Sequence, residues 1–142
     1  ISIITFYMVW LTCFKICPVL KYQRKMSEEF LAPLMSKLNP FDILLLSVLS
    51  GFCEEVFFRG ILQAELGLVG ASLIFGVFHD PSLKQKAYVV LASLAGLALG
   101  YLYQYTDNLW SAITAHTFHN AVSMMILRYW IKPTPENDEK AV

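Results

Sequence analysis

One long stretch without a charged residue decides the fold class; it covers positions 87–105 and reads AYVVLASLAGLALGYLYQY. A helix that crosses the hydrocarbon core of a bilayer needs about 20 predominantly apolar residues. A second stretch of that length, at positions 108–127, contains no Asp, Glu, Lys or Arg. These two segments therefore predict transmembrane helices directly.

The composition of the whole chain also predicts an integral membrane protein. Of the 142 residues, 56% are hydrophobic and 15% are charged, and the formal net charge is zero. A soluble domain averages about 45–50% apolar and about 25% charged residues. The charge balance argues against a disordered chain and against a nucleic-acid partner bound through a basic surface. Too little polar surface remains to solvate a soluble helical bundle.

We expect an all-α, multi-pass transmembrane bundle with about five membrane segments, one of them short. The Asp80-Pro81 pair ends the short segment, because the residue before a proline is disfavoured in a helix. The chain divides into a first membrane segment with a polar connector (1–40), a core (41–131) and a flexible tail (132–142). Ser27 predicts a short interfacial helix within the connector. The segments cover about residues 2–20, 41–63, 66–79, 86–105 and 109–131.

The basic residues predict the orientation in the membrane. Ten of the eleven Lys and Arg residues lie in or beside the first connector, in or beside the loop after the third segment, or at and after the end of the fifth segment. With five spans, these regions fall on one side of the bilayer. The positive-inside rule makes that side cytoplasmic, or stromal in a plastid. The loops and the C-terminus on the basic side are therefore expected to share one compartment.

Three charged residues lie inside the second membrane segment. Each costs at least about 2.5–3.5 kcal/mol there, so they are candidates for function. Glu55 and Arg59 are four residues apart, which places them in contact along a helix and predicts a structural ion pair. Glu54 has no basic residue three or four positions later. It needs a partner from another helix, and a carboxylate beside a histidine can act as a general base.

The histidines lie inside or at the end of apolar segments. His116 and Asn120 are four residues apart and project to one helix face. They can both donate hydrogen bonds to a developing oxyanion, or they can bridge helices; the spacing alone does not choose. His79 ends the short segment, and His119 is offset to the edge of the site. Such a cluster fits proton chemistry, hydrolysis, transport or pigment ligation.

Three motifs in this order resemble a known family. Residues 54–59 match EExxxR, residues 75–79 match FxxxH, and residues 116–120 match HxxxN. The sequence is similar to the CPBP family, the CAAX proteases and bacteriocin-processing enzymes also called Abi. The resemblance implies that residues 41–131 form a catalytic core of an all-helical intramembrane endopeptidase.

The resemblance also implies a role for each motif residue. Glu54 and His79 would activate water, and His116 and Asn120 would form the oxyanion hole. Glu55 and Arg59 would hold the scaffold. The expected partners are membrane lipid and a peptide or protein substrate, with a membrane-protein complex left open. The alternative is a non-catalytic scaffold or assembly factor that binds a partner protein or a pigment.

The four catalytic candidates predict the geometry of the site. We expect Glu54, His79, His116 and Asn120 to meet in one cavity that opens toward the basic side. No cofactor is expected from the residues, because Asn120 is a poor zinc ligand. The resemblance leaves zinc open, since two His and a Glu can bind that metal.

Overall fold

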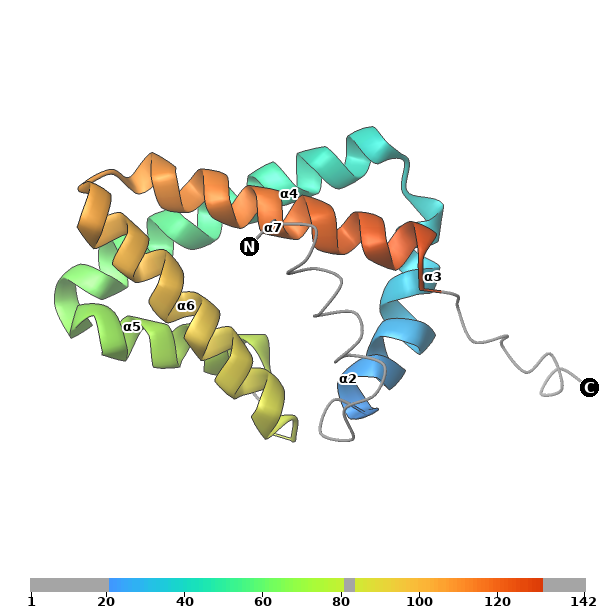
Figure 1. The fold of residues 1–142 in the computed structure, drawn as a ribbon, viewed down its shortest axis with the longest axis horizontal. Helices are drawn as coiled ribbons and strands as arrows, with labels where there is room; N and C mark the ends of the chain where they lie inside the picture. The colour runs from blue at the N-terminus through green and yellow to red at the C-terminus, as the bar shows by residue number, and fades with distance from the viewer. Residues whose placement is uncertain (1–20, 81–83, 132–142) are drawn as a thin grey trace, which may run out of the picture.

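The computed structural model describes residues 21–80 and 84–131, and every regular element in this part of the chain is helical (Figure 1). The predicted segment at 2–20 and the predicted tail at 132–142 lie outside the described residues. The elements are α2 (Lys21–Met26), η2 (Ser27–Leu31), α3 (Ala32–Lys37), α4 (Pro40–Glu55), η3 (Val56–Leu62), α5 (Gln63–His79), α6 (Lys86–Thr106) and α7 (Leu109–Tyr129).

The first connector is helical from Lys21 to Lys37, so the prediction of a polar connector with only a short helix was incomplete. Its last part, α3, packs against α7 through Met35, which is buried. Arg128 near the end of α7 donates hydrogen bonds to the carbonyls of Met35, Ser36 and Leu38. Carbonyls at the C-terminal end of a helix lack partners within it and favour a cation. Arg128 therefore fastens the connector to the core.

A capping box begins α4. The backbone N–H of Asp42 donates to Asn39 Oδ1 at 2.9 Å, and the backbone N–H of Asn39 donates to Asp42 Oδ2 at 3.1 Å. Pro40 follows the N-cap directly, where its missing N–H costs nothing. The start of the second predicted segment is thus confirmed to within one residue.

The chain from α4 to α5 contains a π-helix and a break that the sequence did not predict. Helix α4 ends at Glu55 and continues as η3, whose hydrogen bonds run from residue i to i+5. The break between the second and third predicted segments falls at Gly67, not at residues 64–65. Gly67 has φ 71° and ψ 174°, which an L side chain disfavours. The ribbon turns back at this point in Figure 1.

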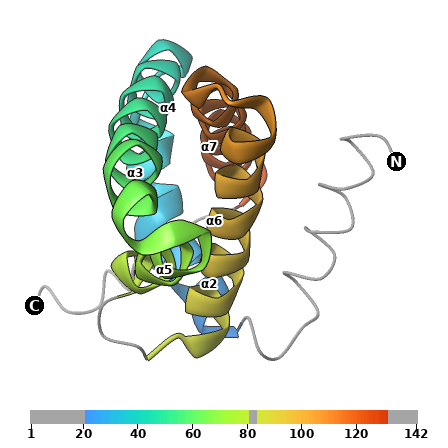
Figure 2. The ribbon, with the colours of Figure 1, turned by 90° about the vertical axis from the view of Figure 1, so that its left-hand side faces the viewer.

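The core consists of two packed helix pairs. Helix α4 packs against α7, and α5 packs against α6; Figures 1 and 2 show each pair side by side. Small residues permit the close contacts between these helices. A Cβ at Gly96 would lie 3.2 Å from Phe75 Cδ1, and one at Gly51 would lie 2.5 Å from Thr117 Oγ1.

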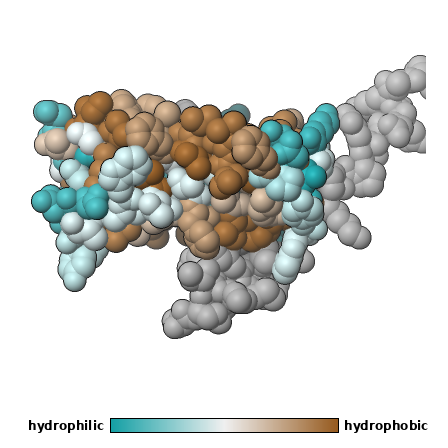
Figure 3. All heavy atoms as spheres, turned by 90° about the horizontal axis from the view of Figure 1, so that it is seen from above, coloured by the Kyte–Doolittle hydropathy of each residue, from teal (hydrophilic) through white to brown (hydrophobic). Residues whose placement is uncertain are grey.

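Apolar side chains cover the middle of the molecule. Large side chains such as Leu45, Leu49 and Leu94 are about half exposed. Figure 3 shows a brown band across one face, with hydrophilic surface at both ends. Within the residues that the structure describes, two helical stretches are long and apolar enough to cross a membrane, Pro40–His79 and Lys86–Thr106, and the first contains two predicted segments. Helix α7 is less apolar because it carries two His, an Asn and an Arg.

Candidate active site

A buried carboxylate, Glu55, lies at the centre of the polar cluster. Its side chain is fully buried at the end of α4. Its Oε1 accepts a hydrogen bond from His116 Nδ1 of α7 at 2.6 Å. Its Oε2 lies 3.0 Å from Arg59 Nε. One carboxylate thus joins the packed pair α4 and α7 to the π-helix that follows.

Arg59 makes two further contacts besides its ion pair with Glu55. Its Nη2 donates to the carbonyl of Gly96 in α6 at 2.9 Å. Its guanidinium carbon lies 4.6 Å from the centre of the Phe75 ring, within the range of a cation–π contact. Only 2% of the residue is exposed. The absence of a side chain at Gly96 is what lets α5 lie so close to this part of α6.

The second nitrogen of His116 faces a different carboxylate. His116 Nε2 lies 3.9 Å from Glu54 Oε2, while Nδ1 contacts Glu55. The two carboxylates therefore approach opposite nitrogens of one imidazole. The side chain of Glu54 is 32% exposed, whereas that of Glu55 is 0% exposed. Glu54 is thus the acid that a water molecule or a substrate can reach.

His79 lies at the C-terminal end of α5 and is exposed. Its Nδ1 lies 2.8 Å from the carbonyl oxygen of Phe75. Because a carbonyl only accepts, Nδ1 carries the hydrogen of this contact, and Nε2 is the ring nitrogen that the contact does not use. The Phe75 ring contacts both imidazoles, with centroids 4.5 Å from His79 and 5.8 Å from His116. One aromatic ring therefore links the two histidine positions.

Asn120 follows His116 by one turn of α7. Its Nδ2 donates to Ser50 Oγ of α4 at 2.9 Å. Both residues are partly buried in the contact between the two helices. His119 is exposed on α7, and no role is assigned to it.

The chain can now be compared with known protein families. Residues 36–122 match the family described as "Type II CAAX prenyl endopeptidase Rce1-like", which is more than half of the chain. The chain belongs to this family. All three motifs of the Rce1-like family lie inside the matched residues, so the resemblance seen in the sequence is confirmed.

A relative of known sequence matches more of the chain. "Uncharacterized protein YpbD" of Bacillus subtilis (strain 168) is 34% identical over 106 residues, which is 75% of this chain. The matched region covers 56% of that relative, so the chain spans little more than half of its length. No solved structure matches the chain.

Sequence reasoning missed the neighbours that hold the site residues. Ser50, Phe75 and Gly96 each make a contact described above, and only Phe75 belongs to a motif. A row of residues spaced four positions apart in the sequence could have indicated which face of the helix packs against its neighbours. It contains Ile43, Ser47, Gly51, Glu55, Arg59 and Gln63, all of them buried. Such a row marks the face of one helix that packs on its neighbours.

A protein zinc site needs at least three grouped donor side chains. Within residues 21–80 and 84–131, no three His, Cys, Asp or Glu side chains are grouped closely enough to hold a metal.

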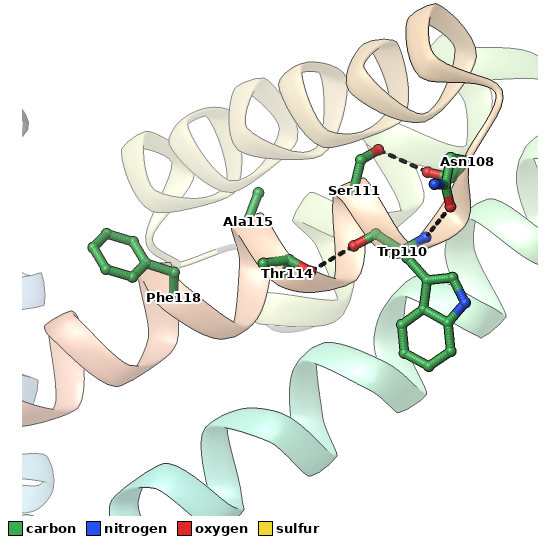
Figure 4. Close-up of a pocket in the computed structure, with 6 residues that line it drawn as sticks. All are labelled: Asn108, Trp110, Ser111, Thr114, Ala115 and Phe118. Carbon is green, nitrogen blue, oxygen red and sulfur yellow. Dashed lines mark hydrogen bonds between the residues drawn. The ribbon is translucent and has the colours of Figure 1, made fainter.

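A shallow hollow lies elsewhere, on the outer face of α7 (Figure 4). Its volume is about 600 Å³. It is lined by Asn108, Trp110, Ser111, Thr114, Ala115 and Phe118. None of the four predicted catalytic residues lines it, so a cavity common to those four residues stays a prediction.

Proposed function

We propose that this chain is an intramembrane endopeptidase that hydrolyses a peptide bond by general-base activation of water. The observation that carries the proposal is the environment of His116. Glu55 holds one nitrogen of the imidazole, and the other nitrogen faces Glu54, whose side chain is partly exposed. A structural cluster gains nothing from a second carboxylate that is left accessible, whereas a hydrolase needs one.

The proposed first step is the attack of water on the substrate carbonyl. Glu54 and the free Nε2 of His79 orient the water, and one of them accepts its proton as oxygen bonds to the carbonyl carbon. The oxyanion then accepts hydrogen bonds from Asn120 Nδ2 and from His116 Nε2, with the His116 ring carrying a hydrogen on each nitrogen. When the C–N bond breaks, the stored proton passes to the leaving amine. Glu54 and His79 thereby return to their starting state.

A membrane location supports this chemistry. In the described part of the chain, two stretches are long and apolar enough to span a bilayer. Polar groups inside a membrane segment are functional candidates by default. We propose that the basic loops and the C-terminus face the cytoplasm or the stroma. The family description names a CAAX prenyl endopeptidase, so a prenylated C-terminal peptide is the first substrate class to test.

One observation favours the alternative, a membrane scaffold or assembly factor. Asn120 already donates to Ser50 across the contact between α4 and α7. A residue kept for helix packing would make this kind of contact. The two functions are separated by whether the protein cleaves any peptide.

The test is peptide cleavage in water enriched in ¹⁸O. The purified chain in lipid nanodiscs is incubated with a farnesylated CAAX peptide and with the same peptide lacking the lipid. Mass spectrometry should find one ¹⁸O atom in the new C-terminal carboxylate. A chain that leaves these peptides and a wider peptide library intact would support the scaffold.

A further inference from the structure

We propose that Glu55 is a positioning residue that fixes the orientation and the hydrogen of His116, and that Arg59 holds Glu55 for this purpose. Its catalytic consequence rests on the proposed function. The scaffold role expected from the sequence assigns these two residues only to stability. The geometry points to a continuous series of contacts from Arg59 through Glu55 to His116. The series ends at Nε2, the nitrogen of His116 that takes part in the proposed reaction.

The contacts run from the helix core to the accessible carboxylate. Gly96 O accepts from Arg59 at 2.9 Å, and Arg59 Nε lies 3.0 Å from Glu55 Oε2. Glu55 Oε1 then accepts from His116 at 2.6 Å. These side chains are almost fully buried, at 2% for Arg59, 0% for Glu55 and 5% for His116. The first partly exposed side chain in this series is that of Glu54, whose Oε2 faces Nε2 of His116.

The chemistry of these groups fixes a hydrogen on Nδ1 of His116. A carboxylate paired with a guanidinium only accepts hydrogen bonds. Nδ1 of His116 must therefore carry a hydrogen toward Glu55, and Nε2 is the nitrogen turned toward Glu54. A partner on one ring nitrogen is the ordinary means by which proteins select which nitrogen reacts. A contact of 2.6 Å falls at the short end expected for a bond to a charged acceptor.

Packing fixes the remaining freedom of the ring. Phe75 contacts His116 at 67° between the ring planes, and the same ring lies against the Arg59 guanidinium. A rotation of the imidazole would break its contact with Phe75 as well as the hydrogen bond to Glu55. Arg59 and His116 are thus held by two shared neighbours.

The chain supplies its own control for a purely structural role. Gln63 lies four residues after Arg59, is buried, and donates to the carbonyl of Gly100 in α6 at 3.1 Å. Arg59 and Gln63 therefore both bind a glycine carbonyl of α6. Only Arg59 is connected through Glu55 to His116. A variant of Gln63 removes a comparable helix contact and leaves the positioning contacts in place.

The test is ¹⁵N NMR of histidine in the full chain in nanodiscs, combined with peptidase kinetics. In the wild type we expect a strongly downfield Nδ1 proton for His116, identified by its loss in His116→Gln. Glu55→Gln should move this signal upfield and lower kcat at least about tenfold, with KM within about twofold, since Glu55 touches no substrate. Gln63→Ala should leave the signal unchanged.

A second variant keeps the test decisive if Glu55→Gln does not fold. Glu55→Asp retains the charge beside Arg59 but withdraws the carboxylate by one methylene, so the signal should also move upfield and kcat should fall. The proposal is overturned if Glu55→Asp keeps the wild-type signal and kcat, or if Gln63→Ala shifts the signal equally. If the NMR behaves as expected but the wild type cleaves no peptide, the peptidase assignment fails while the positioning of His116 stands.

Discussion

At the residue scale, Asn120 makes an observed contact between two helices and also has a role in the proposed mechanism. It donates to Ser50 at 2.9 Å, which ties α7 to α4. In the proposed mechanism the same amide also donates to the oxyanion. Ser50 takes part in the helix contact but not in the proposed catalysis. Variants of Ser50 and Asn120 therefore distinguish an effect on packing from an effect on catalysis.

We predict that Asn120→Ala lowers kcat by about 10²–10³, the cost of removing one donor to an oxyanion. Ser50→Ala should lower the free energy of unfolding by about 0.5–1.5 kcal/mol and leave kcat close to the wild-type value. Both variants delete one and the same hydrogen bond. Equal kcat values for the two variants, measured with the peptide substrate, would show that Asn120 serves packing alone.

The contact between Glu55 and Arg59 within one helical stretch could be predicted from the sequence, but the contacts between different helices could not. A spacing of four residues was enough to place Glu55 beside Arg59, which lie 3.0 Å apart. That spacing says nothing about which nitrogen of His116 meets which acid. The answer depends on how α7 is rotated against α4, and this rotation is set by contacts such as that of Gly51 with Thr117.

At the element scale, the contact between α4 and α7 controls the site because each helix carries half of it. A Cβ at Gly51 would lie 2.5 Å from Thr117 Oγ1 and 3.0 Å from Thr117 N. The second atom belongs to the backbone, so no side-chain rotation relieves the clash. Gly60 offers a comparison, since a Cβ there would meet only Leu109 Cδ2, at 3.9 Å.

Gly51→Ala should destabilise the protein by about 1–3 kcal/mol, the usual cost of overpacking, and should lower activity because α4 and α7 move apart. Gly60→Ala should be neutral or stabilising by up to about 1 kcal/mol, since Ala favours a helix more than Gly does. Thermal unfolding in nanodiscs measures both variants. A Gly51→Ala variant as stable as Gly60→Ala would mean that the helices are not in close contact.

Helix ends were predictable where capping chemistry marks them. Asn39 and Asp42 form the capping box of α4, and α6 ends next to Asp107, which has φ 47°. The π-helix at 56–62 carries no comparable sequence signal, because its residues are ordinary helix residues. Gly67 was missed because a glycine in an apolar run has several explanations, of which a positive φ is only one.

At the scale of the whole molecule, the apolar surface and the distribution of charge predict an orientation. With five spans, Lys25 and Lys84 lie on the basic side and Asp107 lies on the opposite side. After removal of the native cysteines, Lys25→Cys and Lys84→Cys should react from the same side of the membrane with an impermeant maleimide. Asp107→Cys should react from the other side. Labelling of positions 25 and 84 from opposite sides would contradict the five-span topology.

The most direct test of the hydrolytic site is Glu54→Gln, measured for cleavage and for stability in the same preparation. The side chain is 32% exposed and its contact to His116 is 3.9 Å, so its loss should change the unfolding temperature little. In the proposed mechanism Glu54 and His79 together orient and deprotonate the water, so we predict that Glu54→Gln abolishes ¹⁸O incorporation into the peptide product. A folded Glu54→Gln variant that cleaves the peptide at the wild-type rate would contradict the account.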